Sequence, residues 1–292
     1  MDKKAIPNKI YLTLEGGLGD VIYDYLRGHR NWGRLKALKE WRPGVQVKAM
    51  LSTHNPQSIE LIRHNPYINH IEEFGWQNDG RPLFAKHANG YSDIQQYSRV
   101  IANLPDKTPE IYLNPSDKKI ANNIVSQGRF VFIHPFAGLG NRKAFKSVEK
   151  FIPIIDTLID DSKYHVVVIG NSHNRKNAKS ALMINEDFGY ERDGLFNLVN
   201  KPGTNVRVAF QLAKHAHSFI GSWSCYSCTF WALKKRSIVI VPNQLQEMLS
   251  KRFKRGGRWH QRGHCRTIYT QENTSGEDVA SKISNWYNSK EG

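Results

Sequence analysis

A carboxylate follows a glycine-rich turn near the amino terminus, where residues 15–20 read Glu-Gly-Gly-Leu-Gly-Asp. Glycines at such a turn let the backbone bend tightly and let a ligand approach its N–H groups. Gly17 and Gly19 match the first two glycines of a G-x-G-x-x-G dinucleotide motif, but Ile22 replaces the third, which disfavours an NAD-dependent enzyme. Asp20 opens a predicted helix, where it is either an N-cap or an ionised general base.

A second glycine-rich segment follows a predicted strand and runs from His134 through Gly138 and Gly140 to Lys143. Backbone N–H groups of such a loop, together with a lysine, can stabilise negative charge on a diphosphate leaving group without a metal ion. A solvated basic loop is the alternative. Gly170 ends another apolar segment, at the edge of a parallel sheet where ligands bind.

These segments resemble the heptosyltransferase-type glycosyltransferases of family 9, in the same order along the chain. The resemblance implies that Asp20 removes the proton of an acceptor hydroxyl. It also implies that Lys143 contacts the diphosphate of a nucleotide-sugar donor, and Phe145 stands where the family usually has Trp. The implied fold is α/β of the GT-B type, with two Rossmann-like lobes whose parallel sheets face a central cleft.

The donor-site signature of that family reads G-x-D-S-G-x-x-H at a helix start, and the matching segment here reads G-S-W-S-C-Y-S-C. Gly221 and Ser224 match, whereas Trp223 and Cys228 replace the family's Asp and His. Ser222 and Ser224 are therefore expected to bind phosphate at the helix N-terminus. The sugar of the donor is left open.

Cys225 and Cys228 have the spacing of a zinc-ligand pair, and His260 and His264 follow later in the chain. The interval between the two pairs is far longer than the roughly 12–15 residues of a zinc finger. A structural zinc ion is therefore not expected, and no cofactor is predicted besides the sugar-nucleotide co-substrate. Cysteines in such a helix are usually buried as small apolar groups.

Residues 251–266 form a basic segment without acidic residues, in which Phe253, Trp259 and glycines are interleaved with the charges. Like charges repel unless an anion compensates them, so this segment is predicted to bind a polyanionic acceptor; a solvated loop is the alternative. Its predicted contacts are Lys251, Arg252, Lys254, Arg255, Arg258 and Arg262. The whole chain has 42 Lys and Arg against 26 Asp and Glu, a net charge of +16.

Short apolar segments alternate with amphipathic ones, which predicts parallel sheets built from βαβ units. Strands are predicted at 9–14, 45–51, 68–71, 130–133, 165–169, 218–220 and 237–241, and helices from about 20 into the 30s and at 58–63, 93–104, 117–127, 147–159, 206–215, 224–233 and 277–287. An acceptor-side lobe is expected over 1–115 and a nucleotide-sugar lobe over 116–276. The closing helix, 277–290, is expected to pack back on the first lobe.

Composition bounds the setting of the protein. Three cysteines in 292 residues exclude a disulfide scaffold, and no apolar stretch approaches the ~20 residues of a membrane span. The amino terminus lacks an apolar signal core, so a cytoplasmic protein is expected.

The predicted function is an inverting, metal-independent glycosyltransferase, with hydroxylated bases of phage-type modified DNA slightly favoured as acceptor. One alternative is a lipopolysaccharide core heptosyltransferase-like enzyme at the inner membrane surface. Another is a non-catalytic nucleic-acid-binding protein with a degenerate GT-B fold.

Overall fold

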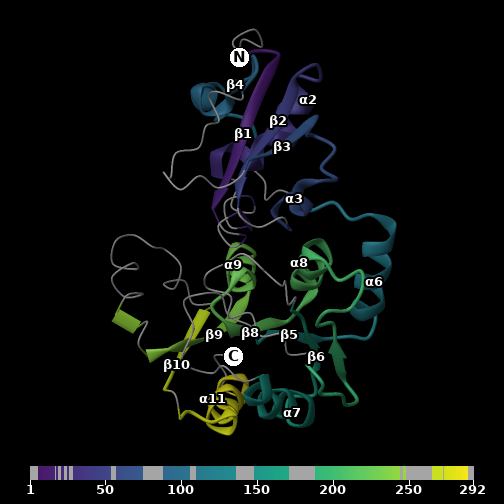
Figure 1. Ribbon diagram of the computed structural model, residues 1–292, viewed down its shortest axis with the longest axis vertical. Helices are drawn as coiled ribbons and strands as arrows, with labels where there is room; N and C mark the ends of the chain where they lie inside the picture. The colour runs from purple at the N-terminus through teal and green to yellow at the C-terminus, as the bar shows by residue number, and fades with distance from the viewer. Residues whose placement is uncertain are drawn as a thin grey trace. The chain divides into compact units, whose positions relative to one another are not determined.

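The computed structural model describes residues 6–16, 18, 21–22, 25, 29–53, 57–74, 88–105, 110–135, 148–170, 188–243, 246–247, 265–271 and 273–288. The chain divides into two compact units, one formed by Met1–Asn114 with Asn205–Arg207 and the other by Pro115–Thr204 with Val208–Gly292. Each unit contains a parallel sheet (Figure 1). No helix in the described part of the chain is long and apolar enough to cross a membrane.

Unit 1 has a four-stranded sheet in the order β3-β2-β1-β4. Its strands are β1 (Lys9–Gly16), β2 (Gln46–Thr53), β3 (His70–Phe74) and β4 (Ser92–Asp93), and its helices are α2 (Leu35–Trp41), α3 (Gln57–Ile62) and α5 (Ser98–Ile101). Two 3-10 helices, His29–Arg34 and Ile94–Tyr97, precede α2 and α5. The predicted first helix is described only at Leu18, Val21, Ile22 and Tyr25, which are helical and buried.

The two faces of the unit 1 sheet differ in polarity because apolar residues alternate along its strands. Ile10 and Leu12 on β1 are fully buried, as are their counterparts Val47 and Ala49 on β2. On the other face Lys48 is also buried, and its ammonium lies 2.9 Å from a Glu72 carboxylate oxygen. One face therefore supplies an apolar core and the other contains an internal ion pair.

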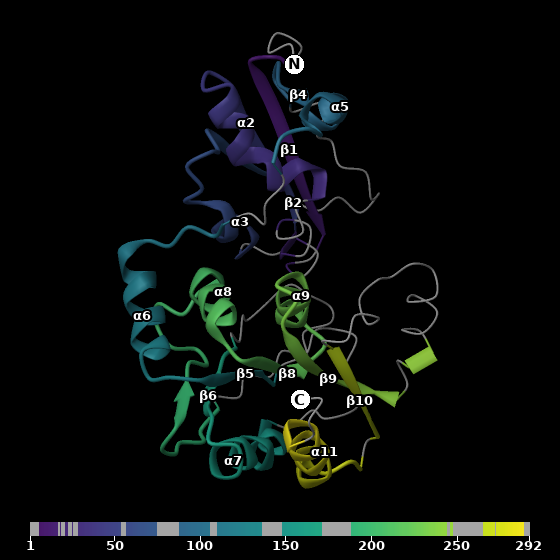
Figure 2. The same ribbon diagram turned by 180° about the vertical axis from the view of Figure 1, so that it is seen from behind.

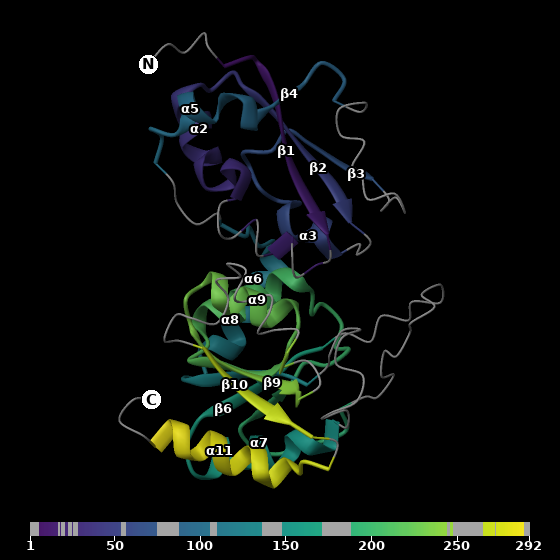
Figure 3. The ribbon, with the colours of Figure 1, turned by 90° about the vertical axis from the view of Figure 1, so that its left-hand side faces the viewer.

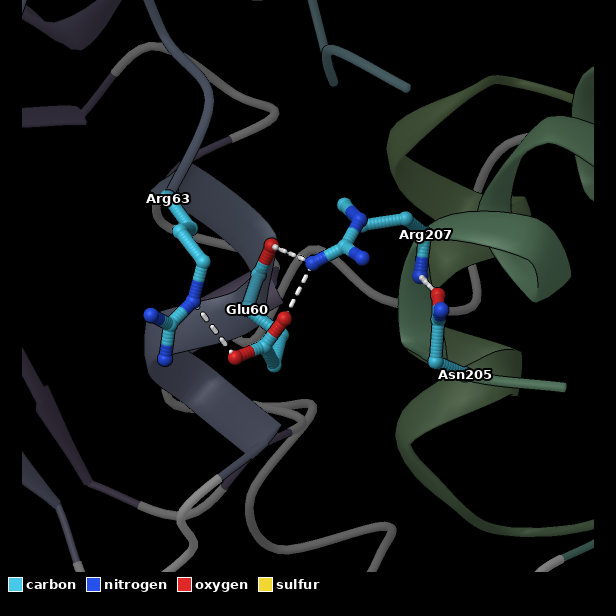
Figure 4. Close-up of polar contacts among 4 residues, drawn as sticks. All are labelled: Glu60, Arg63, Asn205 and Arg207. Carbon is cyan, nitrogen blue, oxygen red and sulfur yellow. Dashed lines mark hydrogen bonds and ion pairs between the residues drawn. The ribbon is translucent and has the colours of Figure 1, made fainter. Parts of the chain in front are cut away.

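Unit 1 also contains a buried arginine, Arg207, which belongs to it although it is far along the chain. Arg207 pairs with the Glu60 carboxylate and donates to the Glu60 carbonyl oxygen at 3.4 Å (Figure 4). Arg63, which directly follows α3, donates from Nε to the same carboxylate at 2.6 Å. The Asn205 side chain accepts the Arg207 backbone N–H at 2.9 Å and so caps the start of the next helix. Glu60 therefore compensates two guanidinium groups, one of which is almost fully buried.

Unit 2 has a six-stranded sheet in the order β10-β9-β8-β5-β6-β7. Its strands are β5 (Phe130–His134), β6 (His165–Val168), β7 (Leu195–Asn197), β8 (Ser218–Ser222), β9 (Arg236–Pro242) and β10 (Cys265–Thr270). Its helices are α6 (Pro115–Val125), α7 (Ile152–Asp160), α8 (Val206–His215), α9 (Cys225–Ala232) and α11 (Gly276–Asn288), and a 3-10 helix at Val148–Phe151 leads into α7.

Helices cover both faces of this sheet (Figures 2 and 3). Val131 and Ile133 pack with α7 and α11 on one face, whereas Phe130 and Phe132 pack with α6, α8 and α9 on the other. Burial on both faces explains why β5 and β6 are continuous apolar runs. The closing helix α11 packs against α7 within unit 2.

Candidate functional site

The strand order of unit 2 defines a place where a ligand can bind. Counted along the unit, the order is 3-2-1-4-5-6, that of the doubly wound dinucleotide fold, and it reverses between β5 and β8. The helix after β5 is α7 and the helix after β8 is α9, and these two helices pack on opposite faces of the sheet. The chain therefore leaves the carboxyl ends of two neighbouring strands in opposite directions, which makes this the switch point of the sheet.

Strands β5 and β8 approach each other closely at this end. His134 is the register partner of Gly221, and the Ser222 hydroxyl donates to the Pro135 carbonyl oxygen at 3.3 Å. A Cβ atom at Gly221 would lie 2.4 Å from the His134 carbonyl oxygen. Only glycine allows this approach, so Gly221, which matches the family signature, has a packing reason to be there.

His134 is buried at the end of β5, and its ring lies 4.7 Å from the ring of Tyr226 between centroids. Burial lowers the pKa of this imidazole from 6.5 to about 3. His134 is therefore neutral near pH 7, and it could reach a phosphate only as a neutral hydrogen-bonding group. Tyr226 contacts His134 from the first turn of α9. The sequence does not indicate this contact, because the two residues are far apart in the chain.

Helix α9 begins directly after β8, with Ser224 as an extended N-cap residue. The Ser227 hydroxyl accepts the Ser224 backbone N–H at 3.2 Å and donates to the Ser224 carbonyl oxygen at 2.7 Å. The first turn of α9 contains no acidic residue. The positive end of the helix dipole is therefore not neutralised from within its own first turn.

One aromatic and two thiol side chains lie at this helix start. Trp223 is partly buried against the core that α8 and α9 share. Burial raises the pKa of the Cys225 thiol to about 12, and Cys228 is buried in the same helix. All three cysteines of the chain are outside disulfide bonds. Protonated thiols that pack against a core, Cys228 buried and Cys225 partly buried, act as apolar groups rather than nucleophiles.

Cys225 and Cys228, whose spacing is that of a zinc-ligand pair, have no further metal ligand beside them in the part of the chain that is described. No three His, Cys, Asp or Glu side chains gather there as a metal site. His260 and His264 lie outside the described residues.

The structure brings together the predicted site residues of unit 2 that it describes. His134, Gly170, Ser222 and Ser224 all follow or end strands β5, β6 and β8 at the same edge of the sheet. Gly170 continues the sheet edge, since its carbonyl oxygen accepts the Asn200 backbone N–H at 3.2 Å. The other predicted residues lie outside the described part: Gly17, Gly19, Asp20, Gly138, Gly140, Lys143, Lys251, Arg252, Lys254, Arg255, Arg258 and Arg262.

Unit 1 has a corresponding switch point, because its order, β3-β2-β1-β4, reverses at β1. Glu15 lies next to the last residue of β1, Gly16, and is the register partner of Ser52. The Trp32 indole donates to the Thr13 carbonyl oxygen at 3.2 Å and anchors the same strand. A carboxylate thus lies on β1 just before the glycine-rich turn. Its position at the strand end could have marked it in the sequence, but the resemblance directed attention to Asp20.

Comparisons with solved structures agree with this architecture. The E. coli ADP-heptose LPS heptosyltransferase II is 14% identical, with a TM-score of 0.51 over 96% of this chain and 98% of that one. A glycosyl transferase family 9 protein from Veillonella parvula is 10% identical, with a TM-score of 0.51 over 98% of this chain and 92% of that one. By sequence, neither a known protein family nor a curated protein matches this chain.

At these identities the likeness establishes the fold. The protein has the α/β fold of the GT-B type, with a parallel sheet in each unit. The structures it is similar to are a heptosyltransferase and a family 9 glycosyltransferase, which confirms the resemblance drawn from the sequence motifs.

Proposed function

We propose that this protein is a glycosyltransferase that moves a sugar from a nucleotide-diphosphate sugar to a hydroxyl of a polyanionic acceptor. The observation that carries the proposal is the switch point of the unit 2 sheet, where β8 leads into a helix without acidic residues in its first turn. Backbone N–H groups at such a helix start favour a diphosphate. The GT-B fold supports the same assignment.

The proposed reaction is a single displacement. Asp20 removes the proton of the acceptor hydroxyl, whose oxygen forms a bond to the anomeric carbon of the sugar. The bond from that carbon to the diphosphate oxygen breaks on the opposite side, so the configuration inverts and a nucleoside diphosphate leaves. Lys143, the glycine loop around Gly138 and Gly140, and the start of α9 stabilise the charge of this leaving group. Because these groups supply the compensation, turnover is expected to continue in EDTA.

The acceptor we favour is a hydroxylated base of modified DNA, because the chain has a net charge of +16 and a basic segment at 251–266. A lipopolysaccharide core would also offer hydroxyls next to phosphates. The two acceptors are distinguished by incubating the protein with a sugar-nucleotide panel and each acceptor in turn. Mass spectrometry then detects a hexose, pentose or heptose increment on hydroxymethylated DNA or on the core oligosaccharide.

The catalytic assignment is tested by replacing Asp20 with Asn. We expect turnover to fall by about 10³-fold or more with donor affinity nearly unchanged, because a general base contributes roughly 10²–10⁴-fold and acts on the acceptor. Glu15→Gln is the matched control, since it neutralises another carboxylate near the end of β1. Full activity in Asp20→Asn would contradict the assignment, and loss only in Glu15→Gln would move the base to Glu15.

A non-catalytic nucleic-acid-binding role is the second candidate, favoured by Trp223 and Cys228 at positions where the family signature has Asp and His. This candidate predicts DNA binding that no sugar nucleotide alters. It also predicts that no sugar nucleotide raises the thermal unfolding temperature of the protein, whereas the transferase requires such a rise.

A further inference from the structure

A group of aromatic and basic side chains lies at the amino-terminal edge of the unit 2 sheet, opposite to the switch point. These residues precede or begin the neighbouring strands β6, β5, β8 and β9 or end helix α11. Because parallel strands all begin at one edge, the chain brings these residues together from distant segments. We refer to Arg129, Tyr164, His217, Arg236, Trp286 and Tyr287 as the amino-edge cluster.

The rings of the amino-edge cluster pack against one another. Tyr164 stacks on His217, with centroids 4.8 Å apart and an interplanar angle of 23°. The Tyr287 ring lies 5.6 Å from that of Tyr164 and 6.1 Å from that of His217, and its hydroxyl hydrogen-bonds to the Ser218 hydroxyl. The cluster is therefore a connected framework that holds its polar atoms in place.

Two arginines lie against this framework. The Arg236 guanidinium is 4.2 Å from the Trp286 ring centroid and 5.6 Å from that of Tyr287, and the Arg129 guanidinium is 5.2 Å from the Tyr164 centroid. Among the described residues, no carboxylate forms an ion pair with either arginine. Cation–π contacts offset part of their desolvation, but they add no negative charge.

His217 lies close enough to these arginines for their charges to act on its ring, and it carries one ring nitrogen without a hydrogen-bond partner within the described structure. Burial, followed by the charges of Arg129, Arg236 and Lys235, lowers the pKa of His217 to about 4, so the ring is neutral near pH 7. Arg129 donates to His217 Nδ1 at 3.2 Å, which assigns the ring proton to Nε2. His217 Nε2 and Arg236 Nη2 are both buried, and neither has a hydrogen-bond partner within the described structure.

A buried donor that lacks an acceptor destabilises the fold, and an acceptor that binds there removes this cost. We propose that the amino-edge cluster binds a phosphate-class oxyanion, which accepts hydrogen bonds from His217 Nε2 and Arg236 Nη2. A water molecule could accept the same hydrogen bonds, but only an anion also compensates the charge of the arginines. The site lies at the opposite edge of the sheet from α9, so it is separate from the proposed donor site.

Titration of the full-length protein with inorganic phosphate, followed by calorimetry, tests the proposal. His217→Phe keeps a ring for Tyr164 and removes the Nε2–H donor, and Arg236→Gln removes the charge. Each is expected to weaken phosphate binding about tenfold or more, because a hydrogen bond to a charged group contributes roughly 1.5–3 kcal/mol. Far-UV circular dichroism verifies that each variant folds. If Arg236→Gln does not fold, the phosphate affinity of His217→Phe alone tests the proposal.

Two controls locate the bound phosphate. Lys119→Gln removes one exposed charge from α6, and Ser224→Asp places a carboxylate at the opposite edge of the sheet. Lys119→Gln should keep the affinity of the parent protein. In Ser224→Asp, the binding that His217→Phe and Arg236→Gln weaken should remain, even if phosphate bound at the proposed donor site is lost. Loss of binding in Ser224→Asp, with full binding in His217→Phe and Arg236→Gln, would place the phosphate at α9 and overturn the proposal.

Flotation with vesicles that contain phosphatidylglycerol distinguishes a lipid headgroup from free phosphate. If the parent protein binds phosphate saturably and the two variants do not, the ligand is a soluble oxyanion. If the parent protein floats with the vesicles and the same variants do not, the ligand is a lipid headgroup. The proposal fails if the parent protein binds neither, or if the variants bind as the parent does.

Discussion

His134 shows how the surroundings of a side chain set its chemistry. In the sequence it stands beside a glycine loop and a lysine, where a histidine could contribute positive charge to a phosphate site. In the fold it ends a buried strand and packs on Tyr226, and burial lowers its pKa to about 3. Any positive charge for an anion at this edge must therefore come from other residues, such as Lys143, or from the start of α9.

The low pKa of His134 predicts a pH dependence of stability. Between the unfolded pKa near 6.5 and the folded pKa near 3, the unfolded chain binds a proton that the folded chain does not. The stability that the neutral, buried His134 contributes is therefore complete above pH 6.5 and is lost as the pH falls below that value. From pH 6.5 to 5 we expect the unfolding free energy to drop by about 2 kcal/mol through this group.

Urea denaturation at a series of pH values measures this slope. His134→Gln cannot be protonated, so its stability should depend less steeply on pH over the same interval. An equal slope in the variant and the parent would show that His134 is not buried in its neutral form.

Elements position the groups that single residues provide. Helix α3 holds Glu60 against the buried Arg207, and α9 presents its N-terminus at the carboxyl edge of the unit 2 sheet. In the first arrangement a carboxylate compensates a buried guanidinium, and in the second the positive end of a helix dipole is available to the proposed diphosphate. Each can be tested with a variant that changes charge and keeps shape.

Glu60→Gln leaves the Arg207 guanidinium buried without its carboxylate. We expect the unfolding free energy to fall by about 1–3 kcal/mol, since hydrogen bonds to charged groups contribute at this level and Glu60 is partly exposed. Glu40→Gln, at an exposed position of α2, should change it by less than about 0.5 kcal/mol. Urea denaturation compares the two variants, and equal losses would argue against a stabilising role for the Glu60–Arg207 pair.

Ser224→Asp and Ser224→Asn form a matched pair at the start of α9. Both side chains are good N-caps, so the helix should be retained in each. The aspartate also places a negative charge where the proposed diphosphate binds, and we expect it to weaken donor affinity about tenfold or more relative to the asparagine variant. Calorimetry with the nucleotide diphosphate measures both affinities. Equal affinities of the two variants would show that the donor diphosphate does not bind at the start of α9.

At the scale of the whole molecule, the excess of positive charge is the main constraint on the partner. A net charge of +16 raises the local concentration of polyanions around the protein. The affinity of the proposed polyanionic acceptor should therefore fall as the salt concentration rises, whichever hydroxyl that acceptor offers.

Binding to duplex DNA should depend steeply on salt. If about six phosphates are neutralised, affinity should fall by roughly 10³-fold between 50 and 200 mM NaCl, because condensed counterions are released on binding. Fluorescence anisotropy with labelled DNA measures the slope. Replacing Arg255 and Arg258 together by Gln should reduce the slope by about two phosphates, and an unchanged slope would exclude those two arginines from the DNA contact.

Several elements could be predicted because their residue pattern is local. The apolar runs of β5, β6, β8 and β9 predict strands, and the predicted bounds of α8, Val206–His215, are the observed ones. Helix α6 begins at Pro115, two residues earlier than predicted, because proline fits the first position of a helix. Strand β10 was missed: it is half exposed, and its first residues continue the basic segment.

The site was predictable only in part. Ser222, Ser224 and Gly221 follow a local motif that the sequence displays directly. No local motif shows which residues contact this site. The contact of His134 with Tyr226, and the close approach that requires glycine at position 221, join segments that are far apart in the chain. The same holds for the amino-edge cluster, whose members come from four strand starts and one helix end.

The sequence by itself determined the alternation of strands and helices, the fold type, the charge and the motif at the start of α9, since periodicity and composition act along the chain. Only the tertiary structure decided the strand order, the placement of α11 in unit 2 and the neutral state of His134. These depend on which segments meet in space, because burial and close packing are properties of neighbours that no local pattern records.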